Sequence, residues 1–160
     1  MVQTHSAVRR ANNQDIPRLL DLLHQVLEIH AAGRSDIFIS GTTKYTSQQL
    51  EALIADERTP IFVLTDETNH VQGYAMCEIE TTSSENMYPI TTLYIDDLCV
   101  DEACRGKGYG KVLYEAVKAY ARTIHAYHIT LNVWACNSSA VAFYRSIGLK
   151  PMKTMMEEVL

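Results

Sequence analysis

The residue types best suited to chemistry gather at residues 105–110, RGKGYG, where three of six residues are glycine. A chain without Cβ atoms can turn tightly and bring its backbone N–H groups close to an anion. A helical pattern begins at Tyr109, and the start of a helix adds unpaired N–H groups and partial positive charge. We therefore expect this loop to bind a phosphate group. The alternative is a plain glycine turn between a strand and a helix.

The spacing of the glycines disagrees with two common phosphate-binding motifs. A Walker loop needs Gly-Lys followed by Ser or Thr, whereas Lys107 is followed by Gly108 and Lys111 by Val112. A dinucleotide-binding fold places its glycines after the first strand, with an acidic residue about 20 positions later. Here the glycines follow the fourth strand-like segment.

Two adjacent carboxylates, Asp96 and Asp97, interrupt the apolar strand-like segment that precedes the glycines. Neighbouring residues of a strand point to opposite faces, so we expect at least one carboxylate on a covered face of a sheet. Burial raises the pKa of an unpaired carboxyl group, which makes it a candidate proton acceptor. Either residue could act as a general base, directly or through water. The alternative is a structural ion pair or hydrogen bond.

The elements that must position these residues alternate between strands and helices. Apolar residues at helical spacing predict helices, and runs of β-forming residues predict strands. We expect helices over 15–30, 46–59, 109–126 and 137–147, and strands over 7–11, 61–64, 71–80, 92–100, 128–133 and part of 152–160. Strands followed by helices that lead to further strands indicate a mixed α/β sheet whose later part is parallel.

Length and composition predict a single domain over residues 1–160, of which 47% are hydrophobic. The net charge of −5 argues against a nucleic-acid partner or a membrane surface. No apolar run approaches the length of a membrane helix, and the N-terminus lacks an apolar signal region, so we expect a cytoplasmic protein. The four cysteines include no C-x-x-C pair and the histidines show no ligand spacing, so we expect reduced thiols and no metal.

The glycine loop and a set of downstream residues resemble the motifs of one family. Arg105-x-x-Gly108-x-Gly110 after a strand resembles the acyl-CoA pyrophosphate loop of the GNAT superfamily of N-acyltransferases. Downstream residues also fall where that superfamily places its Asn-x-x-Ala, Phe-Tyr and Gly-Phe-like pattern: Asn137, Ala140, Phe143, Tyr144, Gly148 and Leu149. The resemblance, specific over 92–150, implies a GNAT-like α/β fold. Such a fold has four helices and a mostly antiparallel sheet of six to seven strands, with one parallel pair splayed apart.

The resemblance also implies that acetyl-CoA binds along the parallel pair of strands, with its thioester between them. The backbone amides expected to hold the pyrophosphate belong to Arg105, Gly106, Lys107, Gly108, Tyr109 and Gly110. The strand backbone of Leu98, Cys99 and Val100 would line the pantetheine arm. Asn137 would form a hydrogen bond to that arm, and Tyr144 would also contact the cofactor.

Acyl transfer from a thioester to an amine requires a neutral amine, a polarised carbonyl group and a proton for the departing thiolate. Tyr144 is the expected proton donor, and Asp96 or Asp97 is the expected base. A covalent route through a nearby cysteine is not expected, because no histidine neighbours these thiols in the sequence. We therefore expect direct attack of the amine on the thioester.

The acceptor is expected to be a primary amine of a small molecule or peptide. Residues 1–85 carry 6 basic and 12 acidic side chains, which suits a cationic acceptor. Glu78, Glu80 and His30 are secondary candidates on the acceptor side. The family resemblance and the apolar stretch 152–160, which could form a shared strand, favour a homodimer. Two other functions remain open, a non-catalytic acyl-CoA-binding regulatory domain and a nucleotide-binding protein.

Overall fold

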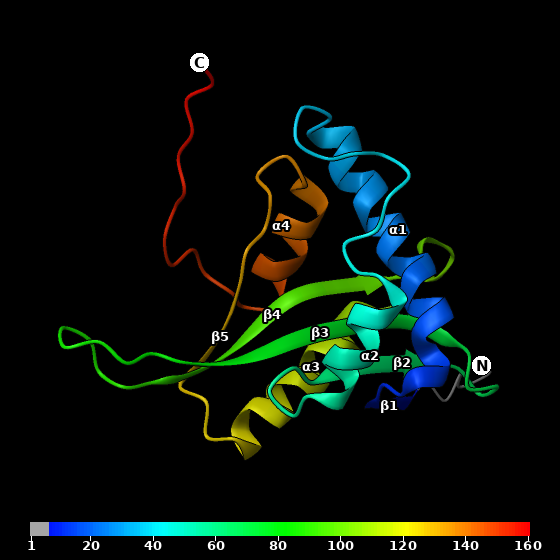
Figure 1. The fold of residues 1–160 in the computed structure, drawn as a ribbon, viewed down its shortest axis with the longest axis horizontal. Coiled ribbons are helices and arrows are strands. Elements are labelled where there is room, and N and C mark those ends of the chain that lie inside the picture. The colour runs from blue at the N-terminus through cyan, green and yellow to red at the C-terminus, as the bar shows by residue number, and fades with distance from the viewer. Residues whose placement is uncertain (1–6) are drawn as a thin grey trace.

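Runs of β-branched and aromatic residues build one mixed sheet in the computed structural model, which describes residues 7–160. Its strands lie side by side in chain order: β1 (Ala7–Arg10), β2 (Ile61–Thr65), β3 (Val71–Thr81), β4 (Thr91–Val100) and β5 (His128–Leu131). The first four strands are antiparallel neighbours, and β5 is parallel to β4. The predicted mixed α/β fold is therefore confirmed (Figure 1).

Four α-helices within the same residues accompany the sheet: α1 (Ile16–Gly33), α2 (Ser47–Ala55), α3 (Tyr109–Thr123) and α4 (Ser138–Ser146). A capping box between Thr46 and Gln49 begins α2, as the sequence predicts. None of the helices in the described part of the chain is long and apolar enough to cross a membrane.

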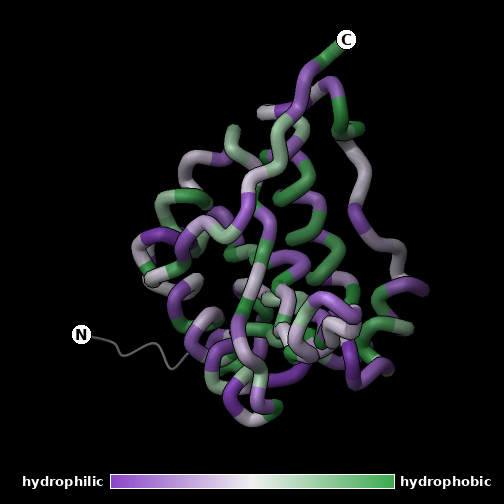
Figure 2. Tube along the Cα trace, turned by 90° about the vertical axis from the view of Figure 1, so that its left-hand side faces the viewer, coloured by the Kyte–Doolittle hydropathy of each residue, from purple (hydrophilic) through white to green (hydrophobic). Residues whose placement is uncertain are grey.

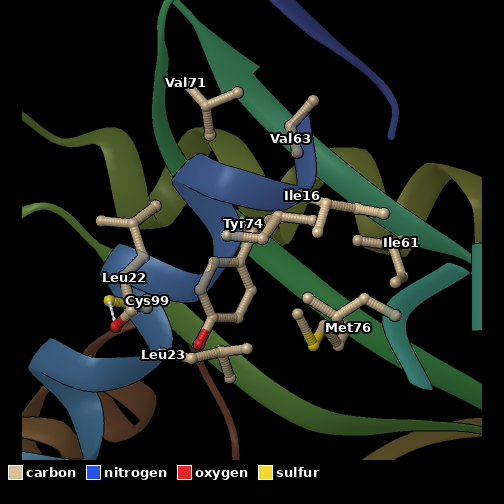
Figure 3. Close-up of a cluster of buried hydrophobic side chains, with 11 residues drawn as sticks. Ile16, Leu22, Leu23, Ile61, Val63, Val71, Tyr74, Met76 and Cys99 are labelled. Atoms are coloured by element: carbon tan, nitrogen blue, oxygen red, sulfur yellow. Dashed lines mark hydrogen bonds between the residues drawn. The ribbon is translucent and has the colours of Figure 1, made fainter. Parts of the chain in front are cut away.

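Two apolar cores form, one on each face of the sheet. The core beneath α1 and α2 consists of Ile16, Leu19, Leu22, Leu23, Leu50, Ile61, Val63, Val71, Tyr74, Met76 and Cys99. Figure 3 shows the ring of Tyr74 in the middle of these side chains. The core beneath α3 consists of Phe62, Ala75, Cys77, Leu93, Ile95, Tyr114, Val117 and Ala121. β4 contributes to both, so its polar side chains lie next to apolar packing.

A β-bulge interrupts β4 at the two adjacent carboxylates. The pairing with β3 passes over Asp96, which is the extra residue on β4. Ile95 and Leu98 pack in the core beneath α3. Asp96 and Asp97 instead contact residues that belong to the α1 and α2 side. The expectation that these neighbours point to opposite faces is therefore wrong, because the bulge breaks the alternation of the strand.

The parallel pair ends where the carboxylates begin. Pairing between β4 and β5 runs from Thr92 and His128 to Ile95 and Leu131. β4 then continues to Val100 without a strand on that side in the described residues. The chain after β5 leaves the sheet toward α4 (Figure 1). The backbone edge of this part of β4 is therefore not covered by a strand.

The sheet has fewer strands than the sequence suggests. Five strands form within residues 7–160, whereas six to seven were predicted, and residues 151–160 form none. The apolar side chains of that segment are all at least 73% exposed: Met152, Met155, Met156, Val159 and Leu160. Figure 2 shows the segment extending away from the rest of the chain. A strand requires a backbone partner, and this segment has none in the single chain.

Candidate functional site

The glycine loop lies between β4 and α3 and follows a short 3-10 turn, Glu102–Cys104. Gly106 and Gly108 have φ of 79° and 81°, in the left-handed region that favours glycine. A Cβ added at either position would meet no atom within 4 Å, so the space next to the loop is open. Across residues 7–160, the amides of 106–108 donate to no protein acceptor. They are therefore available to an anion at the start of α3.

Gly110 brings α3 close to α4. A Cβ at this position would lie 3.0 Å from Cζ and 3.2 Å from Cε2 of Phe143. The ring of Tyr144 is next to that of Phe143, with ring centroids 5.2 Å apart. Because a larger residue at position 110 would push against Phe143, this glycine also helps to place Tyr144.

Arg105 and Asn137 make local contacts at the two sides of this loop. Arg105 Nε donates to the carbonyl oxygen of Val100 at 3.3 Å, which ties the loop to the end of β4. Asn137 Oδ1 accepts from the backbone N–H of Ala140 at 3.1 Å and so caps α4. Only the amide NH₂ of Asn137 is then left to donate to a pantetheine arm, and that contact stays a prediction.

Asp97 lies in a polar contact within the core beneath α1. The hydroxyl of Tyr74 donates to Asp97 Oδ2 at 2.8 Å. Burial raises the pKa of Asp97 to about 6, an effect larger than the opposing hydrogen bond from Tyr74 and the charge of Lys44. Asp97 is therefore ionised at neutral pH, yet basic enough to take up a proton.

Tyr144 on α4 is the second group suited to proton transfer. Burial raises the pKa of its phenol well above the ordinary value, and the negative charge of Asp97 acts in the same direction. The phenol therefore keeps its proton at neutral pH. Because the charge of Asp97 affects Tyr144, the two predicted proton-transfer groups lie within electrostatic range of each other.

Asp96 has a different environment from Asp97. Its Oδ1 accepts from Lys44 Nζ at 2.7 Å, and its Oδ2 accepts from the hydroxyl of Tyr45 at 2.6 Å. Lys44 and Tyr45 come from the loop between α1 and α2. Both oxygens of Asp96 are thus engaged in holding that loop against β4. The structure therefore gives different surroundings to Asp96 and Asp97, which the sequence left as equal candidates for the base.

Two hollows flank these residues. A cavity of about 30 Å³ adjoins Asp96, with a lining of Tyr45, Leu53, Thr59, Ile61, Met76, Cys77, Glu78 and Asp96. A more open hollow of about 420 Å³ separates α1 from the start of the glycine loop, with a lining of His24, Gln25, Glu28, Ile29, Ala32, Glu102 and Arg105. Glu78 therefore lies beside the carboxylates, while Glu80 lines neither hollow.

Cys99 is a poor nucleophile, and the other two cysteines near the site make only local contacts. Burial raises the pKa of Cys99 to about 12, and its thiol donates to the carbonyl oxygen of Leu22 at 3.7 Å. Cys104 donates to Gln72 Oε1 at 2.8 Å. Cys136 is exposed, and its Sγ lies where a side chain on Gly33 would have to fit.

The secondary candidate His30 lies in an aromatic cluster, whereas three residues that contact the carboxylates carry no sequence signal. His30, in the last turn of α1, packs against Phe38 and Trp134, with ring centroids 5.1 and 6.4 Å away. Burial, and then the charge of Lys44, lowers the pKa of His30. Lys44, Tyr45 and Tyr74 were not predicted, because each contacts its carboxylate from a distant part of the chain without a motif. Only their spatial neighbours identify them.

The chain resembles known acetyltransferases over most of its length. Residues 23–149 match the family described as "Acetyltransferase (GNAT) family". The crystal structure of a mutant of the BH1408 protein from Bacillus halodurans is 34% identical, with a TM-score of 0.93 over 96% of this chain and 99% of that chain. An aminoglycoside acetyltransferase from an uncultured soil metagenomic sample is 19% identical, with a TM-score of 0.75 over 100% and 98% of the two chains. Glucosamine-6-phosphate N-acetyltransferase from Arabidopsis thaliana is 19% identical, with a TM-score of 0.71 over 96% and 97%. These last two share the fold alone.

Proposed function

Because this chain belongs to the GNAT family of acetyltransferases, we propose that it transfers an acetyl group from acetyl-CoA to a primary amine of a small molecule or peptide. The amine attacks the thioester directly. The observation that carries this proposal is the pairing of Asp97, whose pKa is raised to about 6, with Tyr144, whose phenol keeps its proton.

The glycine loop fits the anionic part of acetyl-CoA. Gly106 and Gly108 leave the space beside the loop open, and the amides of 106–108 have no protein acceptor within residues 7–160. Acetyl-CoA supplies an acyl group activated as a thioester. The edge of β4 without a partner strand, at 98–100, and the amide NH₂ of Asn137 would hold the pantetheine arm.

Asp97 and Tyr144 have complementary roles in this proposal. Asp97 accepts the proton of the acceptor ammonium, so that the amine becomes nucleophilic. Tyr144 donates a proton toward the departing sulfur. A phenol has an ordinary pKa of about 10 and a thiol of about 8.5, so this donation becomes favourable only as charge develops on the sulfur. Asp96 holds the loop that carries Lys44 and Tyr45, and it acts as a positioning residue.

The acceptor is a cationic amine in this proposal. Asp96 and Glu78 line the cavity of about 30 Å³ beside β4, and Asp97 follows Asp96 on the same face of that strand. A cationic amine would gain favourable interactions with these carboxylates before it loses its proton. The small volume of this cavity favours an acceptor whose amine lies at the end of a thin, unbranched chain.

The release of free CoA thiol in the presence of a panel of primary amines tests the proposal, together with calorimetric titration of CoA. Turnover of at least one amine, with a preference for amines of higher positive charge, would support it. Tight binding of CoA without turnover of any amine would instead support a non-catalytic acyl-CoA-binding regulatory domain. Displacement of bound CoA by ATP would instead indicate a nucleotide-binding protein.

We further propose that the chain forms a homodimer in which residues 151–160 of each copy pair with the other copy. The outer edge of β5 has no partner strand within residues 7–160, and none of the residues of α4 is buried. The five apolar side chains of 151–160 are exposed in the single chain. Two bonds of 2.6 and 3.2 Å between Arg34 and Glu157 hold the segment near the end of α1. A second copy would cover the apolar segment and the open edge together.

Sedimentation velocity of the full chain over a range of concentrations tests the dimer. The double substitution Met155→Asp with Met156→Asp should give a monomer, because it places two charges in the apolar contact. Lys153→Asp with Thr154→Asp places two carboxylates at polar positions of the same segment and should leave the dimer intact. A monomeric parent chain, or a dimer unaffected by the methionine substitutions, would rule out this interface.

A further inference from the structure

Lys44 places a primary amine of this chain against Asp96, which lines the cavity proposed for the acceptor. Its Nζ lies 2.7 Å from Oδ1 and 3.4 Å from the carbonyl oxygen of Asp96. The same atom lies 5.5 Å from the centroid of the Tyr45 ring, a distance at which an ammonium group interacts favourably with an aromatic face. These contacts hold the end of a long side chain that would otherwise sample many rotamers.

The bulge in β4 puts this amine on the same face as the candidate base. Asp96 and Asp97 are neighbours in the sequence, and both point toward the α1 and α2 side. Lys44 is close enough to lower the pKa of Asp97, and Asp97 is close enough to raise the pKa of Tyr144. A single carboxylate is therefore within electrostatic range of both a primary amine and a proton donor.

The position of Lys44 also allows movement toward the base. Its side chain is 43% exposed, and it lies in the loop between α1 and α2, outside any helix or strand. Rotation of this side chain from Asp96 toward Asp97 exchanges one carboxylate partner for another. The amine therefore remains paired with a carboxylate when it leaves its resting contact.

From this arrangement we propose that the protein acetylates its own Lys44 when acetyl-CoA is bound and no other amine competes. This inference rests on the proposed function. The amine loses a proton to Asp97, and its nitrogen forms a bond to the acyl carbon while the C–S bond breaks. The sulfur leaves with the bonding electrons and takes up the proton of Tyr144. The nitrogen then gives up a second proton, which restores the Tyr144 phenol, and Asp97 releases its proton to water. The products are a neutral amide on Lys44 and free CoA.

The modification changes the charge around the acceptor site. An amide on Lys44 no longer forms an ion pair with Asp96, although it can still donate one hydrogen bond. Asp96 then loses its ion-pair partner, and Asp97 loses a nearby positive charge. Acetylation of Lys44 thus makes the charge of the acceptor side more negative. The acetylated enzyme should therefore bind a cationic acceptor more tightly than the unmodified enzyme does.

Peptide mass spectrometry of the full chain, incubated with acetyl-CoA and no acceptor, tests the inference. Lys111 and Lys153 are exposed lysines outside the site and report uncatalysed acetylation in the same sample. We expect Lys44 to react at least about 10-fold faster than either, because an amine held in the site has a much higher effective concentration. The rate should not depend on protein concentration. Lys44→Arg keeps the charge, cannot be acetylated in this way and serves as the blank.

Asp97→Asn should slow the modification of Lys44 while leaving that of Lys111 and Lys153 unchanged. Equal rates at the three lysines, an unchanged rate at Lys44 in Asp97→Asn, or a rate that rises with protein concentration would overturn the inference. The amine panel separates this result from the proposed function. Turnover of an amine with unmodified Lys44 overturns self-acetylation alone. Bound CoA without transfer to any amine or to Lys44 overturns the proposed function as well.

Discussion

The hydroxyl of Tyr74 on β3 donates a hydrogen bond of 2.8 Å to Asp97 on β4. The two residues are diagonal neighbours, because Tyr74 pairs with Cys99 and Asp97 pairs with Met76. Tyr74 is fully buried, and burial raises the pKa of its phenol well above the ordinary value, so the phenol remains a donor. Asp97 is therefore held in place from the core, while its pKa stays above that of an ordinary carboxyl group.

The first prediction concerns the pH dependence of catalysis. In the proposed mechanism Asp97 accepts a proton only when it is ionised, so kcat/KM should rise with pH and level off above about 6. Asp97→Asn should lower kcat/KM about 100-fold or more and abolish this acidic limb. Asp96→Asn is the matched control and should keep the limb, with the larger change in the KM of the acceptor. An acidic limb that persists in Asp97→Asn would exclude Asp97 as the base.

The second prediction is that Asp97→Asn stabilises the fold at neutral pH. The pKa of Asp97 is about 6 in the folded chain and about 3.9 in an unfolded chain. The unfolded chain therefore loses its proton first as the pH rises, and stability falls between about pH 4 and pH 6. Asparagine removes this loss and still accepts the bond from Tyr74. Urea unfolding at pH 7 should show a gain of about 3 kcal/mol that disappears below about pH 4. An equal gain at both pH values would contradict the charge-based explanation.

The third prediction concerns the proton donor. Tyr144→Phe removes one hydroxyl oxygen and keeps the ring that packs beside Phe143. We expect kcat to fall about 100-fold with little change in melting temperature, since general acid catalysis is typically of that size. Tyr88→Phe makes the same chemical change at a side chain that is 89% exposed, and it should leave kcat unchanged. An unchanged kcat in Tyr144→Phe would remove Tyr144 from proton transfer.

The fourth prediction separates the cofactor contact of the glycine loop from backbone strain. Gly108 and Gly41 have φ of 81° and 84°, and a Cβ at either meets no atom within 4 Å. Alanine at either position should therefore cost a similar amount of stability, about 1 kcal/mol. Only Gly108→Ala should raise the KM of acetyl-CoA, because only Gly108 lies in the loop proposed to bind pyrophosphate. Equal KM values in the two variants would mean that the loop does not approach the cofactor closely.

Local signals in the sequence predicted the frame of the site well. The start of α2 at Thr46, the glycine loop and the start of α3 at Tyr109 lie where the sequence placed them, and α4 begins one residue after the predicted Asn137. Each depends on a few residues that are close along the chain. Backbone conformation and helix capping are decided by such neighbours, so these features follow from composition and spacing.

Features that depend on distant partners could not be predicted in the same way. Lys44 and Tyr45 reach Asp96 across 52 and 51 residues, and Tyr74 reaches Asp97 across 23. The bulge arises from the pairing of β3 with β4, whereas alternation along a single strand predicts opposite faces. The absent strand at 151–160 has the same cause, because apolar composition favours a strand only where a partner is available.

The bulge at Asp96 adds a second carboxylate to one face of β4 without changing the face of any neighbour. Deletion of Asp96 would restore an unbroken ladder in which Asp97 still pairs with Met76 and Ile95 with Cys77. Asp97 would keep its contact with Tyr74, and Leu98 would stay in the core beneath α3. The loop between α1 and α2 would instead lose both of its side-chain contacts to β4, those of Lys44 and Tyr45. Relatives that lack the extra residue should therefore keep the buried carboxylate and differ in how they hold this loop.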